Sequence, residues 1–287
     1  MKKTLIALAV AASAVVSCSA TAALGNWEEN TQGGTVSING TITVVNSPVW
    51  MVATGTGFSG FSSVASDMTD NKEISLQVPE SIPVLEIKTK GAYTVAEYSK
   101  GVMPSIVFTG GDDVAIVKTW NQDGTLSFSA PVYVDGQIAG TAKFDKAMVG
   151  GMMYGDPESG DTGIKLVVSD NYNDPLSLYA GLVGGNRQAS SVDVTEGFLS
   201  QLGMSDLMDD AKGKLDASYS NWADHQWIQS LTPASAADKF KIEGMRKSAT
   251  CMGFGLSTTS TVDLTFTDAL TKTTNWSVPL KVTVQYN

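Results

Sequence analysis

Short stretches of alternating apolar and polar residues recur along the chain and predict an all-β fold. They are rich in β-branched residues and bounded by Gly, Asp, Asn or Pro, as antiparallel strands joined by turns usually are. Asp-Gly pairs within 121–125 and 134–138 predict tight hairpin turns. Many short strands with regular turns indicate a β-sandwich. The expected strands span residues 34–45, 73–79, 82–90, 104–110, 113–120, 125–134, 138–145, 163–169, 260–269 and 275–287.

The strand pattern is interrupted over about 172–250. Residues 194–215 carry apolar side chains at helical spacing, which predicts helix there. Residues 233–245 begin with a proline and a run of alanines, which predicts a short helix or a turn. We expect an insertion folded onto one sandwich, because the strand pattern returns after it. The apolar face of the expected helix contains Thr195, Phe198, Leu199, Leu202, Leu207 and Met208.

Residues 1–22 have the pattern of a secretory signal peptide. A basic start precedes a short apolar run over 5–16, and an A-x-A cleavage site follows at 20–22. The run is too short to span a bilayer, which favours a cleaved signal over a membrane anchor. The alternative is a lipoprotein modified at Cys18, because "VVSC" loosely matches a lipoprotein cleavage box.

The chain is acidic, which argues against nucleic acid as a partner. Cleavage after residue 22 would leave 265 of the 287 residues. Loss of Lys2 and Lys3 would reduce 19 basic side chains to 17 against 29 acidic ones, a net charge of −12. Nucleic acids and anionic membranes both attract basic surfaces. No later segment approaches the roughly 20 apolar residues of a membrane-spanning helix.

Residues that usually carry catalysis or bind metal are sparse. Cys251 would be the single cysteine of the mature chain, and His225 is the only histidine. We therefore expect Cys251 to be a small buried apolar residue, not a nucleophile or half of a disulfide. The acidic run 169–174 lacks the spacing of a calcium loop and is read as a solvated turn. The sequence predicts a protein that is not an enzyme and needs no cofactor or metal.

The two ends of the mature chain resemble fimbrial subunits assembled by the chaperone–usher pathway. "TQGGTVSINGTITVVN", from Thr31, looks like the start of such pilins. "PLKVTVQYN", at the C-terminus, looks like the strand that their chaperones bind, although Thr274 replaces a glycine common before it. The missing disulfide, the length and segments along the chain narrow the resemblance to the subunits of K88-type fimbriae of enterotoxigenic Escherichia coli. In that family the major subunit is itself a lectin-like adhesin.

The resemblance implies an incomplete immunoglobulin-like β-sandwich that is completed by donor-strand complementation. Residues 23–40 would form the N-terminal donor-strand extension, and 41–287 would form the pilin domain with its insertion at about 172–250. Expected partners are identical subunits, a periplasmic chaperone and an outer-membrane usher. Alternatively, 34–45 is the first strand of a self-sufficient sandwich. The donor residues would be Val36, Ile38, Gly40 and Ile42, and the groove strand would present Leu280, Val282, Val284 and Tyr286.

The resemblance also implies a host glycan receptor and a place on the bacterial surface after passage through the periplasm. Residues 175–188 are similar to a segment near the family's carbohydrate site. The expected function is a major fimbrial subunit and lectin-like adhesin; the alternative is a non-adhesive structural or minor subunit. The aromatic members of this set could instead be buried and secure the insertion. The glycan-binding set is Tyr179, Asn186, Arg187, Tyr219, Trp222 and Trp227.

Overall fold

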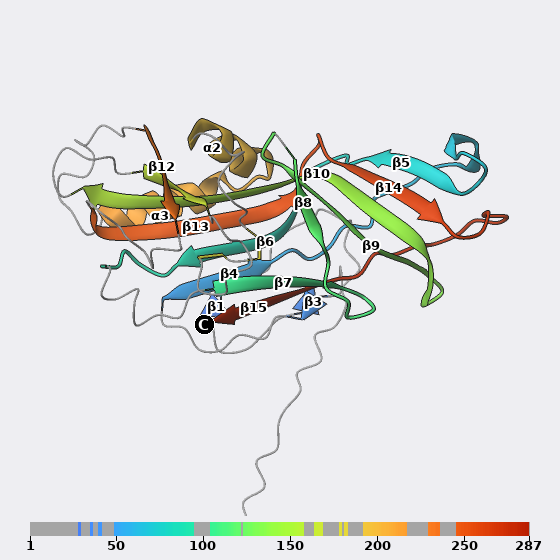
Figure 1. Cartoon of the computed structure of the whole chain (residues 1–287), viewed down its shortest axis with the longest axis horizontal. Coiled ribbons are helices and arrows are strands. Elements are labelled where there is room, and N and C mark those ends of the chain that lie inside the picture. The colour runs from blue at the N-terminus through green and yellow to red at the C-terminus, as the bar shows by residue number, and fades with distance from the viewer. Residues whose placement is uncertain are drawn as a thin grey trace, which may run out of the picture.

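Antiparallel strands make up most of the described chain, and two helices lie against the central sheet (Figure 1). The computed structural model describes residues 28–29, 35–36, 40–41, 49–94, 104–121, 123–157, 164–168, 178–179, 181–182, 192–216, 229–235 and 245–286. The first nine strands and a short 3₁₀-helix are β1 (Glu28–Glu29), β2 (Thr35–Val36), β3 (Gly40–Thr41), β4 (Trp50–Thr54), η1 (Ala65–Asp67), β5 (Glu73–Gln77), β6 (Ile82–Thr89), β7 (Pro104–Gly110), β8 (Lys118–Trp120) and β9 (Leu126–Val134). The remaining elements are β10 (Gln137–Pro157), β11 (Ile164–Val168), α2 (Val192–Gln201), α3 (Ser205–Asp216), β12 (Gln229–Ser235), β13 (Met245–Leu256), β14 (Thr261–Phe266) and β15 (Leu280–Tyr286).

The long strand β10 connects two sheets. Its first part pairs with β9 and β14, and its second part pairs with β13 and β11. The register with β9 shifts between Phe144 and Ala147, and Lys146 between them has a φ of 54°. A left-handed residue in a strand acts as a bulge that bends it. The bend lets β10 enter the central sheet, whose order is β1-β4-β6-β13-β10-β11-β12.

Both hairpins predicted from Asp-Gly pairs are present. At 134–137, Asp135 and Gly136 have φ values of 50° and 77°, as the two central residues of a type I′ turn require. The other pair ends in Gly124, with a φ of 85°, and connects β8 to β9. These turns place β8, β9 and β10 side by side in antiparallel order.

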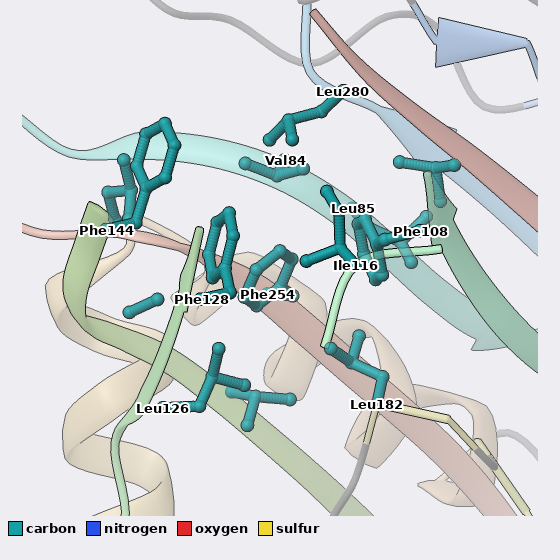
Figure 2. Packing of buried hydrophobic residues seen from close by; sticks show 14 of the residues in the cluster. Val84, Leu85, Phe108, Ile116, Leu126, Phe128, Phe144, Leu182, Phe254 and Leu280 are labelled. Atoms are coloured by element: carbon teal, nitrogen blue, oxygen red, sulfur yellow. The ribbon is translucent and has the colours of Figure 1, made fainter. Parts of the chain in front are cut away.

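A separate two-stranded ribbon, β7–β15, packs over one face of the central sheet. Leu280 lies opposite Gly110 in its antiparallel register. The apolar residues of β15 alternate with more exposed ones, so its inner face joins the core. The rings of Phe108 in β7 and Phe254 in β13 lie 5.1 Å apart in an edge-to-face arrangement, which fixes the ribbon on the sheet (Figure 2).

The opposite face of the central sheet is covered by α2 and α3. The expected single helix is two helices, because Gly203 adopts a φ of 75° and turns the chain between them. Helix and sheet approach closely: a Cβ on Gly253 would lie 2.2 Å from the Met204 sulfur. The seam contains Met148, Met152, Tyr154, Val192, Phe198, Leu199, Leu202, Met204, Leu207, Met208, Ala211, Leu215, Ala249 and Cys251. The prediction that Cys251 is a buried apolar residue is confirmed.

Three predictions of local structure, two of strands and one of a helix or turn, differ from what the structure shows. Within 34–45 the structure describes only 35–36 and 40–41, which form the short strands β2 and β3, with Val36 opposite Gly40. Only 118–120 of the expected strand 113–120 is a strand, because 114–116 instead runs back along β7. Residues 233–235 lie in β12, so the helix or turn expected from 233 is wrong there, and 236–244 lie outside the described residues.

Candidate assembly groove

An apolar cavity of about 390 Å³ opens between two segments that extend the strands β4 and β15. One wall is formed by residues 58–61, which follow β4, and the other by 274–280, which lead into β15. The floor is formed by core-facing residues of the strands β9, β10 and β13. The lining consists of Phe58, Ser59, Phe61, Ile82, Val84, Phe128, Phe144, Phe254, Leu256, Val262, Thr274, Asn275, Trp276, Ser277, Val278, Pro279 and Leu280.

Aromatic rings form much of the cavity floor. Phe128 of β9 and Phe144 of β10 stack with centroids 4.6 Å apart and planes inclined by 13°. Phe254 of β13 lies next to Phe128, at 6.2 Å between centroids. In Figure 2, Val84 and Leu280 lie near these rings, and both residues also line the cavity. The chemistry of this surface suits a partner that presents apolar side chains.

The rim of the cavity connects the two walls through aromatic contacts. Phe58 and Phe61 pack edge to face at 4.9 Å, and Phe61 lies 5.9 Å from Trp276 of the other wall. Sequence reasoning missed this role. Phe58 and Phe61 lie in a Gly- and Ser-rich stretch without strand periodicity, and Trp276 falls in the expected strand 275–287, which begins only at Leu280. For Phe58 and Phe61, the available signal was the presence of large aromatic residues in a stretch that otherwise reads as a polar loop.

The strand β15 borders the groove at its first residue, Leu280, and has one hydrogen-bonded neighbour among the described strands. Among the described strands, β15 hydrogen-bonds only to β7. The predicted groove residues Leu280, Val282, Val284 and Tyr286 are all buried, so β15 contributes them to the core. The side chains between them in the sequence point outward and are more exposed. The structure therefore confirms this strand and its inward face, while the chaperone that would bind it stays a prediction.

Two short strands of the N-terminal segment lie beside the strands from which the groove walls extend. Strand β1 pairs with β4, where Glu28 lies opposite Val52. Strand β3 lies beside β15 at the other wall (Figure 1). Of the predicted donor residues, Val36 and Gly40 lie opposite each other in the β2–β3 pair. Ile38 and Ile42 lie outside the described residues.

The predicted glycan-binding residues are not brought together in the described chain. Tyr179 is fully buried, its ring packs edge to face on Trp50 at 5.8 Å, and its hydroxyl donates to Thr250 Oγ1 at 3.0 Å. These contacts favour the alternative that Tyr179 secures the insertion. The other members of the set, Asn186, Arg187, Tyr219, Trp222 and Trp227, lie outside the described residues.

A buried charge cluster joins α3 to β6 on the helix face. Asp210 bridges Lys88 at 3.0 Å and Lys214 at 2.6 Å. Burial raises the pKa of Glu86 to about 7; Lys88 opposes the shift and Asp206 adds to it. Burial also raises the pKa of the nearby Cys251 thiol to about 12, so this thiol is a poor nucleophile.

Neither a metal site nor a membrane span emerges from the described residues. Over the described ranges, no three His, Cys, Asp or Glu side chains gather in a group that could hold a metal ion. Both described helices, α2 and α3, are too short and too polar to cross a bilayer.

Comparison with known proteins identifies the family. The model of the family of fimbrial major and minor subunits matches residues 1–287. K88 fimbrial protein AC and K88 fimbrial protein AB, both of Escherichia coli, are 28% and 29% identical over 301 and 303 residues, and each match covers 100% of both chains. K88 fimbrial protein AD of the same organism is 28% identical over 307 residues, again at full coverage. Fimbrial proteins form fimbriae on the cell surface, which implies export. The chain therefore belongs to the family of fimbrial major and minor subunits.

Proposed function

We propose that this fimbrial subunit polymerises by donor-strand exchange, with residues 34–45 of one subunit entering the groove of the next. The observation that carries the proposal is the apolar cavity at the start of β15, a strand whose only hydrogen-bonded neighbour among the described strands is β7. Strand addition uses main-chain hydrogen bonds for affinity and alternate side-chain pockets for register. Val36, Ile38 and Ile42 supply the apolar side chains at the alternate positions of such a strand.

The strand order supports an immunoglobulin-like sandwich that lacks one strand. The neighbours β4-β6-β13-β10 follow the order A-B-E-D of an immunoglobulin constant-type sheet, and β7–β15 corresponds to C and F of the second sheet. Strand G, the next neighbour of F in that fold, has no counterpart among the described strands. Its place is the edge of β15 to which no described strand hydrogen-bonds, next to the cavity, and the donor strand fills it.

The physical consequences fit a filament. Each Val or Ile that becomes buried stabilises the joint by roughly 1.5–3 kcal/mol, before the cost of ordering the strand. Gly40 has no side chain to fill its pocket in the groove, so an incoming donor strand can begin to displace the bound strand at that pocket. Because each subunit gives one strand and receives one, the contact is heterologous and propagates instead of closing.

The same geometry accounts for the proposed assembly partners. An unpaired strand edge beside an apolar groove promotes aggregation before assembly. A periplasmic chaperone that lends a strand to β15 protects this edge, and an outer-membrane usher then exchanges that strand for the donor segment of another subunit. The signal peptide at 1–22 delivers the chain to this compartment.

Donor-strand exchange is tested by changing the donor without changing the groove. Ile38→Asp places a charge at an apolar position of the donor strand, so we expect fimbriae to be lost while the complex with the chaperone still forms. Ile38→Val, which keeps the apolar shape, is the matched control. Deletion of residues 23–40 is expected to have the same effect as Ile38→Asp. Normal polymers from the deletion variant would instead show that the donor role of 34–45 is wrong.

We also propose that the subunit is a lectin-like adhesin for host cell-surface glycans. The support is the K88 family membership together with the aromatic residues Trp222 and Trp227 of the insertion, whose flat faces suit the apolar side of a sugar ring. Glycan-array binding by a subunit locked with its own donor strand tests this role. Trp222→Ala is expected to lose binding. A locked subunit that binds no glycan would be a non-adhesive structural or minor subunit.

A further inference from the structure

Two large apolar side chains are exposed on one short connection near the start of β15. Val114 is 62% exposed and Val117 is 81% exposed, and both belong to residues 111–117 between β7 and β8. A single exposed valine is ordinary. Two on one segment, next to a hollow lined by both apolar and polar residues, indicate a surface that can bind another protein.

The hollow lies against this connection and has a volume of about 370 Å³. Residues 114–117 form one side, and Phe128 and Pro131 of β9 lie among the others. Asp112 and Lys143 also line it, one charge of each sign. The lining therefore combines apolar side chains with charges of both signs, as protein–protein contacts commonly do. We call Val114, Val117 and this hollow the end patch.

The end patch lies close to the proposed donor groove. Residues 114–116 run along the edge of β7 that faces away from β15: the Ile116 amide donates to the Phe108 carbonyl at 2.9 Å. The Gly110 amide donates to the Val114 carbonyl at 2.9 Å, and Gly110 lies opposite Leu280 of β15. Two strand spacings, roughly 10 Å, therefore separate the patch from β15.

The direction of the donor strand determines where the rest of the donor subunit lies. This step rests on the proposed function. Strand G of an immunoglobulin sandwich runs antiparallel to F, so the donor strand runs antiparallel to β15 and leaves the groove beside Leu280. Seven Cα–Cα steps, through residues 43–48, lead from the last donor position, Ile42, to Val49, where the continuously described fold begins. They span at most roughly 25 Å, so the body of the donor subunit lies over this end.

We propose that the end patch is a second contact between successive subunits, and that the body of the donor subunit, a second copy of this chain, covers Val114 and Val117. The donor strand holds the two subunits together, and the end patch fixes the angle between them. The patch therefore contributes to the stiffness and heat resistance of the filament, while it adds nothing to occupation of the groove by the strand itself.

The test separates strand binding from contact between subunit bodies. The full-length chain is expressed with its assembly machinery as wild type, as the double variant Val114→Asp and Val117→Asp, and as Val64→Asp. Val64 is 61% exposed on the connection between β4 and β5 and is the matched control. A synthetic peptide of residues 34–45 measures strand binding to each subunit, and electron microscopy with heat dissociation measures the fimbriae.

We expect all three subunits to bind the peptide within about twofold of one another, and the double variant to yield at least fivefold fewer or shorter fimbriae that dissociate at lower temperature. Wild-type fimbriae from the double variant, with normal peptide binding, would overturn the second contact and leave donor-strand exchange intact. An equal loss in Val64→Asp would also overturn it. Absence of peptide binding to the wild type would contradict donor-strand exchange itself.

Discussion

The two faces of the central sheet differ in how completely the chain covers them. On one face, α2 and α3 fill the space so closely that glycines at 150 and 253 are needed beneath them. On the other face, the ribbon β7–β15 leaves an aromatic-lined cavity of about 390 Å³. Protein interiors normally have few voids of that size. Within the described residues the helix face is closely packed, whereas the ribbon face keeps an opening that the proposed donor strand of a partner would fill.

The largest effect on the isolated subunit is expected from the finished face. Leu199 is fully buried between α2 and the sheet, so Leu199→Ala removes packing that nothing else replaces. We expect the free energy of unfolding to fall by about 2–5 kcal/mol, measured by urea denaturation. Ser200→Ala, at the exposed neighbouring position, is the control. A loss below about 1 kcal/mol would mean that the helix seam is not tightly packed.

A pH dependence of about 3 kcal/mol is expected from Glu86 on the same face. Its pKa is about 7 in the folded chain against an ordinary 4.5, so the folded state holds its proton more firmly. The contribution of Glu86 to stability is therefore highest below pH 4.5, falls as the pH rises from 4.5 to 7, and is level above that. Each unit of pKa shift corresponds to about 1.4 kcal/mol. The charges that face Glu86 are Lys88 on β6 and Asp206 on α3, with Asp210 and Lys214 beyond them.

Urea denaturation between pH 4 and pH 8 measures this slope. Glu86→Gln is expected to remove it and to raise the free energy of unfolding at pH 8. Glu73→Gln, at an exposed position of β5, is the control. The same slope in wild type and Glu86→Gln would show that another group causes the pH dependence.

The smallest effect on the isolated subunit is expected at the rim of the unfinished face. Trp276 contacts Phe61 across the cavity mouth but is only half-buried. Trp276→Ala is therefore expected to cost the isolated subunit about 1 kcal/mol, the value of one aromatic pair. Binding of the 34–45 peptide is expected to weaken at least tenfold, because the ring is part of the cavity wall. A large loss of stability with unchanged peptide binding would make the rim an ordinary part of the core.

The alternation of residues predicted the strands that have one buried face, such as β5 and β14. It missed the second half of β10, because both faces are covered there: Val149 and Met153 face the ribbon side, and Met148 and Met152 face the helices. Such a strand reads as a continuous apolar run instead of an alternating one.

Most of the groove could not be predicted, because its walls come from residues more than 200 positions apart in the sequence. The alternating apolar residues of β15 predicted one border correctly. Phe58 and Trp276 meet at the cavity only because β4 and β15 lie on opposite sides of it. Likewise, the alternation in β6 assigns Glu86 to the face away from the core, and only tertiary structure places α3 over that face.

The central claim is that residues 34–45 of one subunit occupy the groove of another. A photo-crosslinking amino acid at position 38, in fimbriae assembled from a mixture of isotope-labelled and unlabelled subunits, tests it directly. Mass spectrometry is expected to find position 38 linked to peptides from 50–61 or 274–286 of a differently labelled subunit. Links confined to the same subunit would contradict the account and would make 34–45 a strand of its own sheet.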